Sequence, residues 1–313
     1  MQLRRCLPTY FPGGAHEFMT EPDAALRTGQ ESAPSLPPQG RLRRSRITAK
    51  ILARIAATRT GGSLLKFLGK FPPGRACLEW CAGFRKPFSS FNEARLCAAT
   101  HLPFDHSHPD NATLHLRLAK RLRPSDYPVL FHLQKIRRIE GVFDLGGNVG
   151  NLFYSYRSHI PQLENAFWRV YDVPAIASMG ESLARDLHES RLSFVSDVTS
   201  LGHADVFLAS GSIHYFEESL AQMLAQQQHR PQHVFVNRTP FLSGDSTYTV
   251  QDAGTFLAAC KLHSHGLLIS EMQALGYECV DEWTVPELEL IIPCFPELSA
   301  RSYSGLYFRL QAI

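Results

Sequence analysis

The sequence predicts an α/β fold built on a doubly wound, mostly parallel sheet. From residue 141 onward, short apolar runs typical of strands alternate with segments that favour helices. The chain has 313 residues, of which 44% are hydrophobic, and can therefore bury a full core. Ligands of such sheets bind beyond the carboxyl ends of the strands, so the residues that follow each strand are the candidates for function.

The expected elements of the carboxyl-terminal part follow one another in a regular order. Strands are expected at 142–145, 167–172, 192–197, 205–210, 233–238, 277–285 and 304–310. Helices are expected near 150–160, after Pro174, from about Glu217 and across 252–275. The alternation assigns residues 141–313 to one Rossmann-like domain.

The amino-terminal part differs in composition and is divided into two further regions. Residues 1–45 are rich in Pro, Gly, Ser and charge without apolar periodicity, which predicts a disordered tail. Residues 46–140 are predicted to form a basic helical cap. Within it, Ser90 and Glu93 have the spacing of a helix-capping pair, and residues 111–122 have helical spacing.

Charge also divides the chain close to Glu140. Residues 1–140 hold 23 Lys and Arg against 10 Asp and Glu, whereas residues 141–313 hold 9 against 19. The segment 41–86 has twelve basic residues, one acid and interleaved apolar residues. It could make peripheral contact with an anionic membrane, or dock its apolar faces on the following domain, which we favour. No nucleic-acid-binding motif accompanies the charge, so a nucleic-acid partner is not expected.

Neither a membrane span nor a metal site is expected. No run approaches the roughly 18 apolar residues of a spanning helix, and the amino terminus lacks the apolar core of a signal peptide. The seven cysteines are odd in number and scattered, which indicates reduced thiols and a cytoplasmic protein. Cys77 and Cys81 lack the second pair of ligands of a zinc site. His106 and His108 have Asp105 and Asp110 nearby but no third clear ligand, so a loop that caps the following helix is the favoured interpretation.

A glycine-rich turn, DLGGNVG, follows the first expected strand. Its spacing is Asp144-x-Gly146-x-x-x-Gly150, and neither register of the dinucleotide fingerprint GxGxxG fits. A P-loop lysine is also missing from the turn. Such a turn lets the backbone approach a ligand and presents helix N–H groups to an anion, while Asp144 could accept hydrogen bonds from an ammonium group.

Two more acids follow the next strands. Asp172 lies where a carboxylate can accept both hydroxyls of a ribose, and Asp197 could accept from an adenine amino group. An aspartate at a strand end is usually a helix cap or a solvated loop residue, and for Asp197 both interpretations stay open. Together with the turn, these acids predict an adenosine-like ligand with an amino-acid end.

The order of these residues resembles that of class I S-adenosylmethionine-dependent methyltransferases. More narrowly, SSFNEA, DLGGNVG, LASGSIHYF and VNRTPF resemble a little-characterised bacterial methyltransferase family often encoded among cell-surface polysaccharide genes. The resemblance covers roughly residues 88–310 and implies seven strands, an antiparallel last strand and S-adenosylmethionine as cofactor. Asn148 replaces a glycine common in the class, which is tolerable because asparagine adopts left-handed conformations readily. The implied cofactor site comprises Asp144, Gly146, Gly147, Asn148, Gly150, Asp172, Asp197, Val198, Ser210 and Gly211.

The acceptor side is expected at SGSIHYF and VNRTPF. His214 could be the general base for a hydroxyl acceptor, or a capping or adenine-packing residue, and Tyr215 would contact substrate. Arg238 could hold an acidic acceptor or fix loop 241–251 through Asp245 or Asp252, which we favour. The expected function is methylation of an oxygen on a sugar or related small molecule. The alternative is a non-catalytic, methyltransferase-like scaffold that docks through its basic amino-terminal region.

Overall fold

The computed structural model describes residues 51–52, 54–55, 58–99, 122–253 and 256–311. The tail expected at 1–45 lies outside these ranges, as do most of the helix expected at 111–122 and the histidines at 106 and 108. Within the described ranges, no helix has the length and apolar character needed to cross a bilayer.

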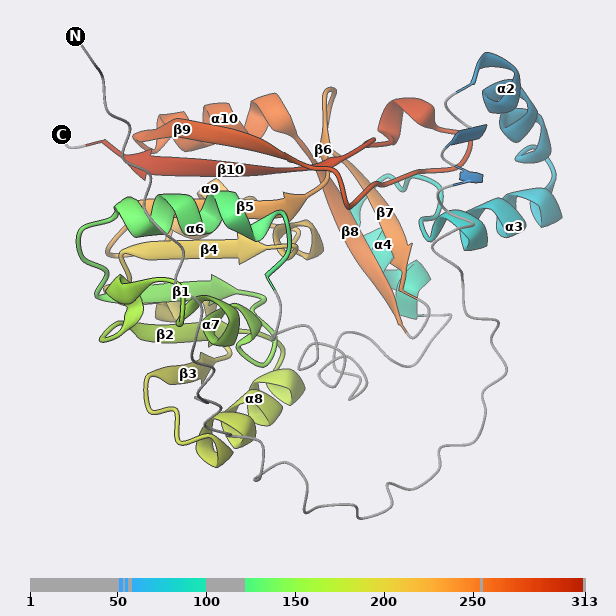
Figure 1. Ribbon diagram of the computed structural model, residues 1–313. Helices are drawn as coiled ribbons and strands as arrows, with labels where there is room; N and C mark the ends of the chain where they lie inside the picture. The colour runs from blue at the N-terminus through green and yellow to red at the C-terminus, as the bar shows by residue number, and fades with distance from the viewer. Residues whose placement is uncertain (1–50, 53, 56–57, 100–121, 254–255, 312–313) are drawn as a thin grey trace, which may run out of the picture. The chain divides into compact units, whose positions relative to one another are not determined.

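The centre of the fold is a seven-stranded sheet (Figure 1). Its strands are β1 (Gly141–Leu145), β2 (Phe167–Tyr171), β3 (Leu192–Val195), β4 (Val206–Ser210), β5 (His233–Thr239), β9 (Tyr277–Val285) and β10 (Tyr303–Leu310). The strand order is β3-β2-β1-β4-β5-β10-β9. The first five strands run parallel, and β10 is antiparallel to both of its neighbours. This confirms the doubly wound sheet and its antiparallel last strand.

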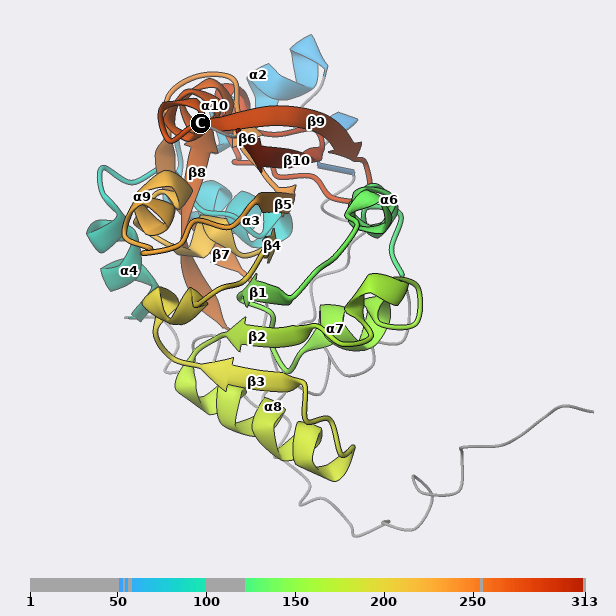
Figure 2. The same ribbon diagram turned by 90° about the vertical axis from the view of Figure 1, so that its left-hand side faces the viewer.

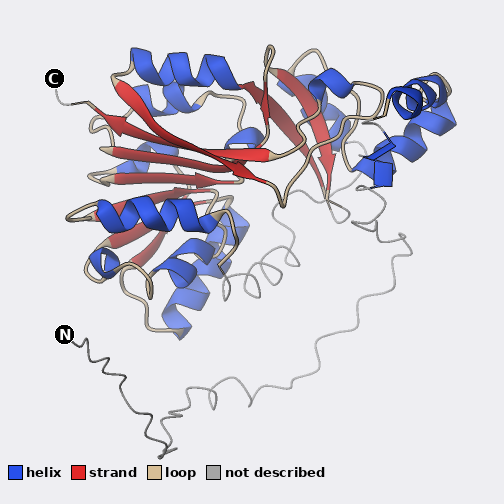
Figure 3. Ribbon diagram, turned by 45° about the horizontal axis from the view of Figure 1, so that its top comes forward, coloured by secondary structure: helices blue, strands red, loops and turns tan. Residues whose placement is uncertain are grey.

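Helices cover both faces of the sheet (Figures 2 and 3). They are α6 (Asp126–Lys135), α7 (Asn151–Tyr156), α8 (Pro174–Asp186), α9 (Leu220–Ala225) and α10 (His265–Ala274). Apolar residues of α6 and α7 form one core cluster with Val142 of β1, while those of α9 and α10 form another with Phe143. All five residues of β1 are buried because both of its faces are covered. The chain order reverses between β1 and β4, which is where ligands of such sheets bind.

A second, three-stranded sheet lies between β5 and α10 in the sequence. It consists of β6 (Phe241–Leu242), β7 (Thr247–Asp252) and β8 (Leu257–Ser264), in the order β6-β8-β7. The helix expected across 252–275 is therefore wrong over its first half and begins only at His265. The apolar residues of LAACKLHS (257–264) are compatible with the period of a helix and with that of a strand. The segment forms a strand because it pairs with β7 and buries Cys260 and Leu262.

The described amino-terminal helices are α2 (Arg59–Leu68), α3 (Pro72–Ala82) and α4 (Phe91–Ala99). Ser90 caps α4 as expected, because its Oγ accepts from the Glu93 N–H at 3.1 Å. Phe84 and Phe88 form bridges to β7, and α4 packs on β7 and β8. The division of the chain at residues 45 and 140 stays a prediction.

Candidate functional site

The glycine-rich turn connects β1 to α7 through three residues with left-handed backbone. Gly146, Asn148 and Gly150 have φ of 67°, 55° and 91°. A Cβ on Gly146 would lie 2.6 Å from the Cβ of Ser212, and one on Gly147 would lie 2.4 Å from a carboxylate oxygen of Asp144. The turn thus packs against the loop after β4 on one side and against Asp144 on the other, which leaves no room for a side chain at Gly146 or Gly147.

Asp144 is buried at the end of β1, with 1% of its surface exposed. Its Oδ2 accepts a hydrogen bond from Trp168 Nε1 at 3.2 Å, whereas its buried Oδ1 has no hydrogen-bond partner in the described part of the chain. Burial raises the pKa of this carboxyl to about 7, and the hydrogen bond from Trp168 partly opposes the rise. A cation placed beside Asp144 would stabilise its ionised form.

Asp172, just after β2, holds the turn from the other side. Its two carboxylate oxygens accept from the N–H groups of Asn148 and Val173, each at 2.8 Å. Burial raises the pKa of Asp172, against the lowering effect of these two hydrogen bonds. Each oxygen retains lone-pair capacity, so ligand hydroxyls remain compatible with this arrangement.

Asp197 is an exposed helix cap. Its carboxylate accepts from the Thr199 N–H at 2.9 Å and from the Thr199 hydroxyl at 2.6 Å, at the start of the 3₁₀ turn Val198–Leu201. These bonds lower the pKa of Asp197. Val198 packs against the core cluster on the α9 side of the sheet. Of the two interpretations left open for Asp197, the contacts show the cap, and contact with adenine stays a prediction.

The loop after β4 lies directly against the glycine-rich turn. Gly211 has a φ of 74° and donates its N–H to the carbonyl oxygen of Asn237 at 2.8 Å. The hydroxyls of Ser210 and Ser212 are buried and have no hydrogen-bond partner among the residues that the structure describes. Since Ser212 also contacts Gly146, buried polar groups surround the point where the strand order reverses.

His214 and Tyr215 lie in the 3₁₀ turn Ile213–Tyr215 that follows this loop. His214 is buried, and its ring centroid lies 4.2 Å from that of Tyr215. The Tyr215 hydroxyl donates to Oε1 of Gln251 on β7. Burial, with Cys260 and Tyr303 nearby, raises the pKa of Tyr215 well above its ordinary value. Tyr215 is therefore a hydrogen-bond donor at neutral pH and cannot serve as a base.

His263 of β8 fixes the turn that carries His214. Its Nε2 lies 3.3 Å from the carbonyl oxygen of Ile213, and burial lowers its pKa to about 4. His263 is therefore neutral near pH 7 and donates from Nε2. Sequence reasoning missed both His263 and Gln251 because it did not foresee β7 and β8.

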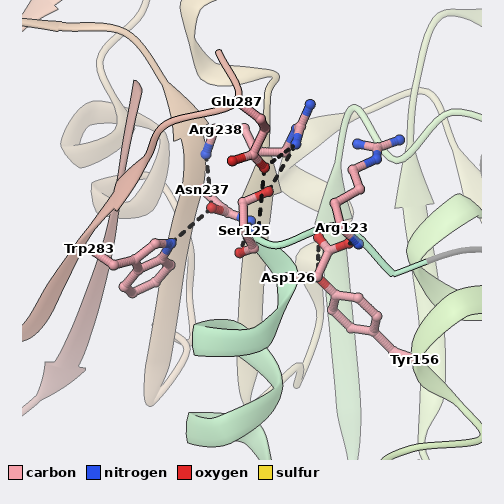
Figure 4. Close-up of polar contacts among 8 residues, drawn as sticks. All are labelled: Arg123, Ser125, Asp126, Tyr156, Asn237, Arg238, Trp283 and Glu287. Atoms are coloured by element: carbon pink, nitrogen blue, oxygen red, sulfur yellow. Dashed lines mark hydrogen bonds and ion pairs between the residues drawn. The ribbon is translucent and has the colours of Figure 1, made fainter. Parts of the chain in front are cut away.

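Arg238 ends β5 in a polar network shown in Figure 4. Its φ is 55°, and its Nη1 donates to Ser125 Oγ at 2.9 Å and to Glu287 Oε1 at 3.3 Å. Asn237 donates to the Ser125 carbonyl at 2.9 Å and accepts from Trp283 Nε1 at 3.1 Å. Among the described residues, these side-chain contacts join Arg238 to the start of α6 and to the segment after β9, not to loop 241–251.

Comparisons with known proteins add little to this geometry. No protein-family model and no curated protein sequence matches the chain. Among solved structures, a 1,6-didemethyltoxoflavin-N1-methyltransferase from Burkholderia thailandensis has 18% identity and a TM-score of 0.45, over 72% of this chain and 93% of its own. The magnesium protoporphyrin IX methyltransferase of Synechocystis has 12% identity and a TM-score of 0.40, over 71% and 93%. Identities and TM-scores this low assign no function to the chain.

The residues at the reversal point fit the cofactor that the sequence predicts. A turn without room for a Cβ lies beside a buried carboxylate oxygen that has no hydrogen-bond partner among the described residues. The amino-acid end of the cofactor, with its ammonium group, has matching chemistry. Across the described ranges, no group of three or more His, Cys, Asp or Glu could hold a metal ion.

Proposed function

We propose that the chain is an S-adenosylmethionine-dependent methyltransferase. The observation that supports this most is the closed turn, in which Gly146 packs against Ser212 and Gly147 packs against the buried carboxylate of Asp144. One oxygen of this carboxylate has no hydrogen-bond partner in the described part of the chain. The turn 146–150 would hold the amino-acid end of the cofactor, Asp144 would lie near its ammonium group, and Asp172 would accept from its ribose. Bound there, the cofactor supplies a methyl group on a positively charged sulfur.

The proposed reaction is transfer to an oxygen of a sugar or related small molecule. The turn that carries His214 follows the loop that touches Gly146, so His214 would be the base that takes the hydroxyl proton. Tyr215, held by Gln251, would line the acceptor side without exchanging protons. Methyl transfer is an in-line displacement, so a rigid placement of both reactants supplies much of the acceleration.

Calorimetric titration with S-adenosylhomocysteine tests the cofactor site. Gly146→Val should abolish tight binding, because the new side chain would collide with Ser212 and the φ of 67° disfavours it. Gly244→Val is the matched control, since a Cβ at Gly244 meets nothing within 4 Å. Asp172→Ala should also abolish tight binding and covers the case in which Gly146→Val does not fold. Unchanged affinity in both site variants, or no binding by the wild type, would contradict the proposal.

A second candidate function, docking on an anionic membrane, is favoured by the surface of α2 and α3. Five large apolar side chains of the segment 64–80 are exposed: Leu64, Phe67, Leu68, Phe71 and Trp80. They alternate along the chain with Lys66, Lys70 and Arg75, a mixture typical of segments that lie on anionic bilayers.

Vesicle sedimentation of the full chain tests this second candidate. Binding to phosphatidylserine vesicles is expected at low salt, should fall at high salt, and should fall at least tenfold in the double variant Phe67→Ser, Phe71→Ser. Absence of binding at low salt would leave the docking of apolar faces within the protein as the better interpretation of this segment.

A further inference from the structure

Two arginines extend beyond the start of α6, at the carboxyl edge of the sheet (Figure 4). Arg238 ends β5, and Arg123 lies just ahead of α6. Burial lowers the pKa of Arg238, and the positive charge of Arg123 lowers it further. Close like charges are unfavourable by themselves, so a pair of this kind needs negative partners.

The negative groups already present satisfy Arg238 but not Arg123. Glu287 pairs with Arg238 at 3.3 Å. The two oxygens of Asp126 accept from the backbone N–H of Arg123 at 2.7 Å and from the Tyr156 hydroxyl at 3.0 Å, which fixes this carboxylate at the start of α6. Within the described ranges, the guanidinium of Arg123 has neither a hydrogen-bond acceptor nor an ion-pair partner. Its five N–H donors therefore remain to be used.

The pair also borders the proposed acceptor loop. The Cβ of Arg238 lies 3.8 Å from the position that a Cβ on Gly211 would take. The residue after Gly211 is Ser212, which contacts Gly146 of the cofactor turn. On the other side of the pair, the Tyr156 hydroxyl donates to Asp126, which also accepts from the backbone N–H of Arg123. Tyr156 belongs to α7, the helix that follows the cofactor turn. An acceptor bound at the pair would have its remaining atoms near the methyl donor.

We propose that Arg123 and Arg238 form a subsite for a carboxylate or phosphate group of the methyl acceptor. This inference rests on the proposed function and narrows its substrate class to acidic small molecules, such as a uronic acid or a sugar phosphate. The planar fork of a guanidinium matches both anions, which it can bind through two parallel hydrogen bonds. Ser125 and Glu287 fix Arg238 in place, and Arg123 supplies the unused donors.

Calorimetry on the full chain, saturated with S-adenosylhomocysteine, tests the subsite. The probes are glucuronate and glucose 1-phosphate, with methyl glucoside as the neutral control, all at one ionic strength. At least one anion should bind ten or more times more tightly than methyl glucoside. Arg123→Gln should weaken that binding at least tenfold, Arg123→Lys should weaken it less, and the exposed Arg137→Gln should leave it unchanged.

The subsite would be overturned by equal binding of neutral and charged probes, by no binding of either anion, or by full anion binding in Arg123→Gln. A tenfold loss of S-adenosylhomocysteine affinity in Arg123→Gln would also overturn it, because the pair would then hold the carboxylate of the cofactor. If the wild type binds no S-adenosylhomocysteine, the proposed function fails and the subsite is not yet decided. The titration with the sugar probes, repeated without S-adenosylhomocysteine, then still tests the arginine pair.

Discussion

The indole Nε1 of Trp168 on β2 donates a 3.2 Å hydrogen bond to Asp144 on the neighbouring strand β1. It is the one hydrogen bond that the described residues give this carboxylate, whose other oxygen is buried without a partner. One neutral donor does not offset the loss of water around a buried carboxylate, so the pKa of Asp144 stays at about 7. The protonation of Asp144 therefore changes within the physiological range.

The first prediction concerns stability against pH. The pKa of Asp144 is about 7 in the folded chain and near 3.8 in the unfolded chain, so between these values the folded state binds more protons. The contribution of Asp144 to the free energy of unfolding is complete below pH 4 and is lost as pH rises to about 7, by about 4 kcal/mol. Asp144→Asn should remove this loss, so urea denaturation at pH 5 and pH 8 should show a smaller decrease in the variant. Equal decreases would place the pKa of Asp144 near its ordinary value.

A second prediction concerns the effect of Asp144 protonation on the affinity for the cofactor product. If the ammonium group of S-adenosylhomocysteine lies near Asp144, it favours the ionised carboxylate, and binding releases a proton below pH 7. The affinity of the wild type should therefore rise up to about tenfold between pH 6 and pH 8. In Asp144→Asn this rise should be missing. Titrations in two buffers with different ionisation enthalpies measure the released proton directly. A pH-independent affinity without proton release would show that the ammonium group does not lie near Asp144.

The third prediction distinguishes the two buried histidines near the acceptor loop. His214→Ala should slow an oxygen methylation about a hundredfold or more while leaving cofactor affinity nearly intact, as expected for a base. His263→Ala should lower activity by loosening the turn at Ile213, without removing a limb of the pH–rate profile, because its pKa of about 4 keeps it neutral. Transfer of a labelled methyl group to an extract of the host cells measures both. Equal loss of activity and cofactor affinity in His214→Ala would indicate a structural histidine.

Sequence patterns were sufficient where a local rule determines the structure. The strand at 277–285 has the bounds expected from its composition, and the glycine spacing located the turn at Gly146 and Gly150. The strand at 257–264 was missed because its apolar residues suit both periods and only its pairing with β7 decides. Ser125 and Glu287 escaped notice for a related reason, since they reach Arg238 only through the topology, from segments 113 and 49 residues away in the sequence.

The last prediction concerns Gly147, whose need for glycine comes from packing rather than from its backbone angles. A Cβ there would lie 2.4 Å from the carboxylate of Asp144, which is itself confined by Trp168 and the sheet. Gly147→Ala should therefore lower the free energy of unfolding by roughly 1–3 kcal/mol, as overpacking does in closed cores. Gly266→Ala in α10 is the matched control, because its Cβ would meet nothing within 4 Å. Alanine has a higher helix propensity than glycine, by about 1 kcal/mol, so this variant should not be less stable than the wild type. Urea denaturation measures both variants. If Gly147→Ala were as stable as the wild type, the carboxylate of Asp144 would have room to move, and position 147 would not require glycine for packing.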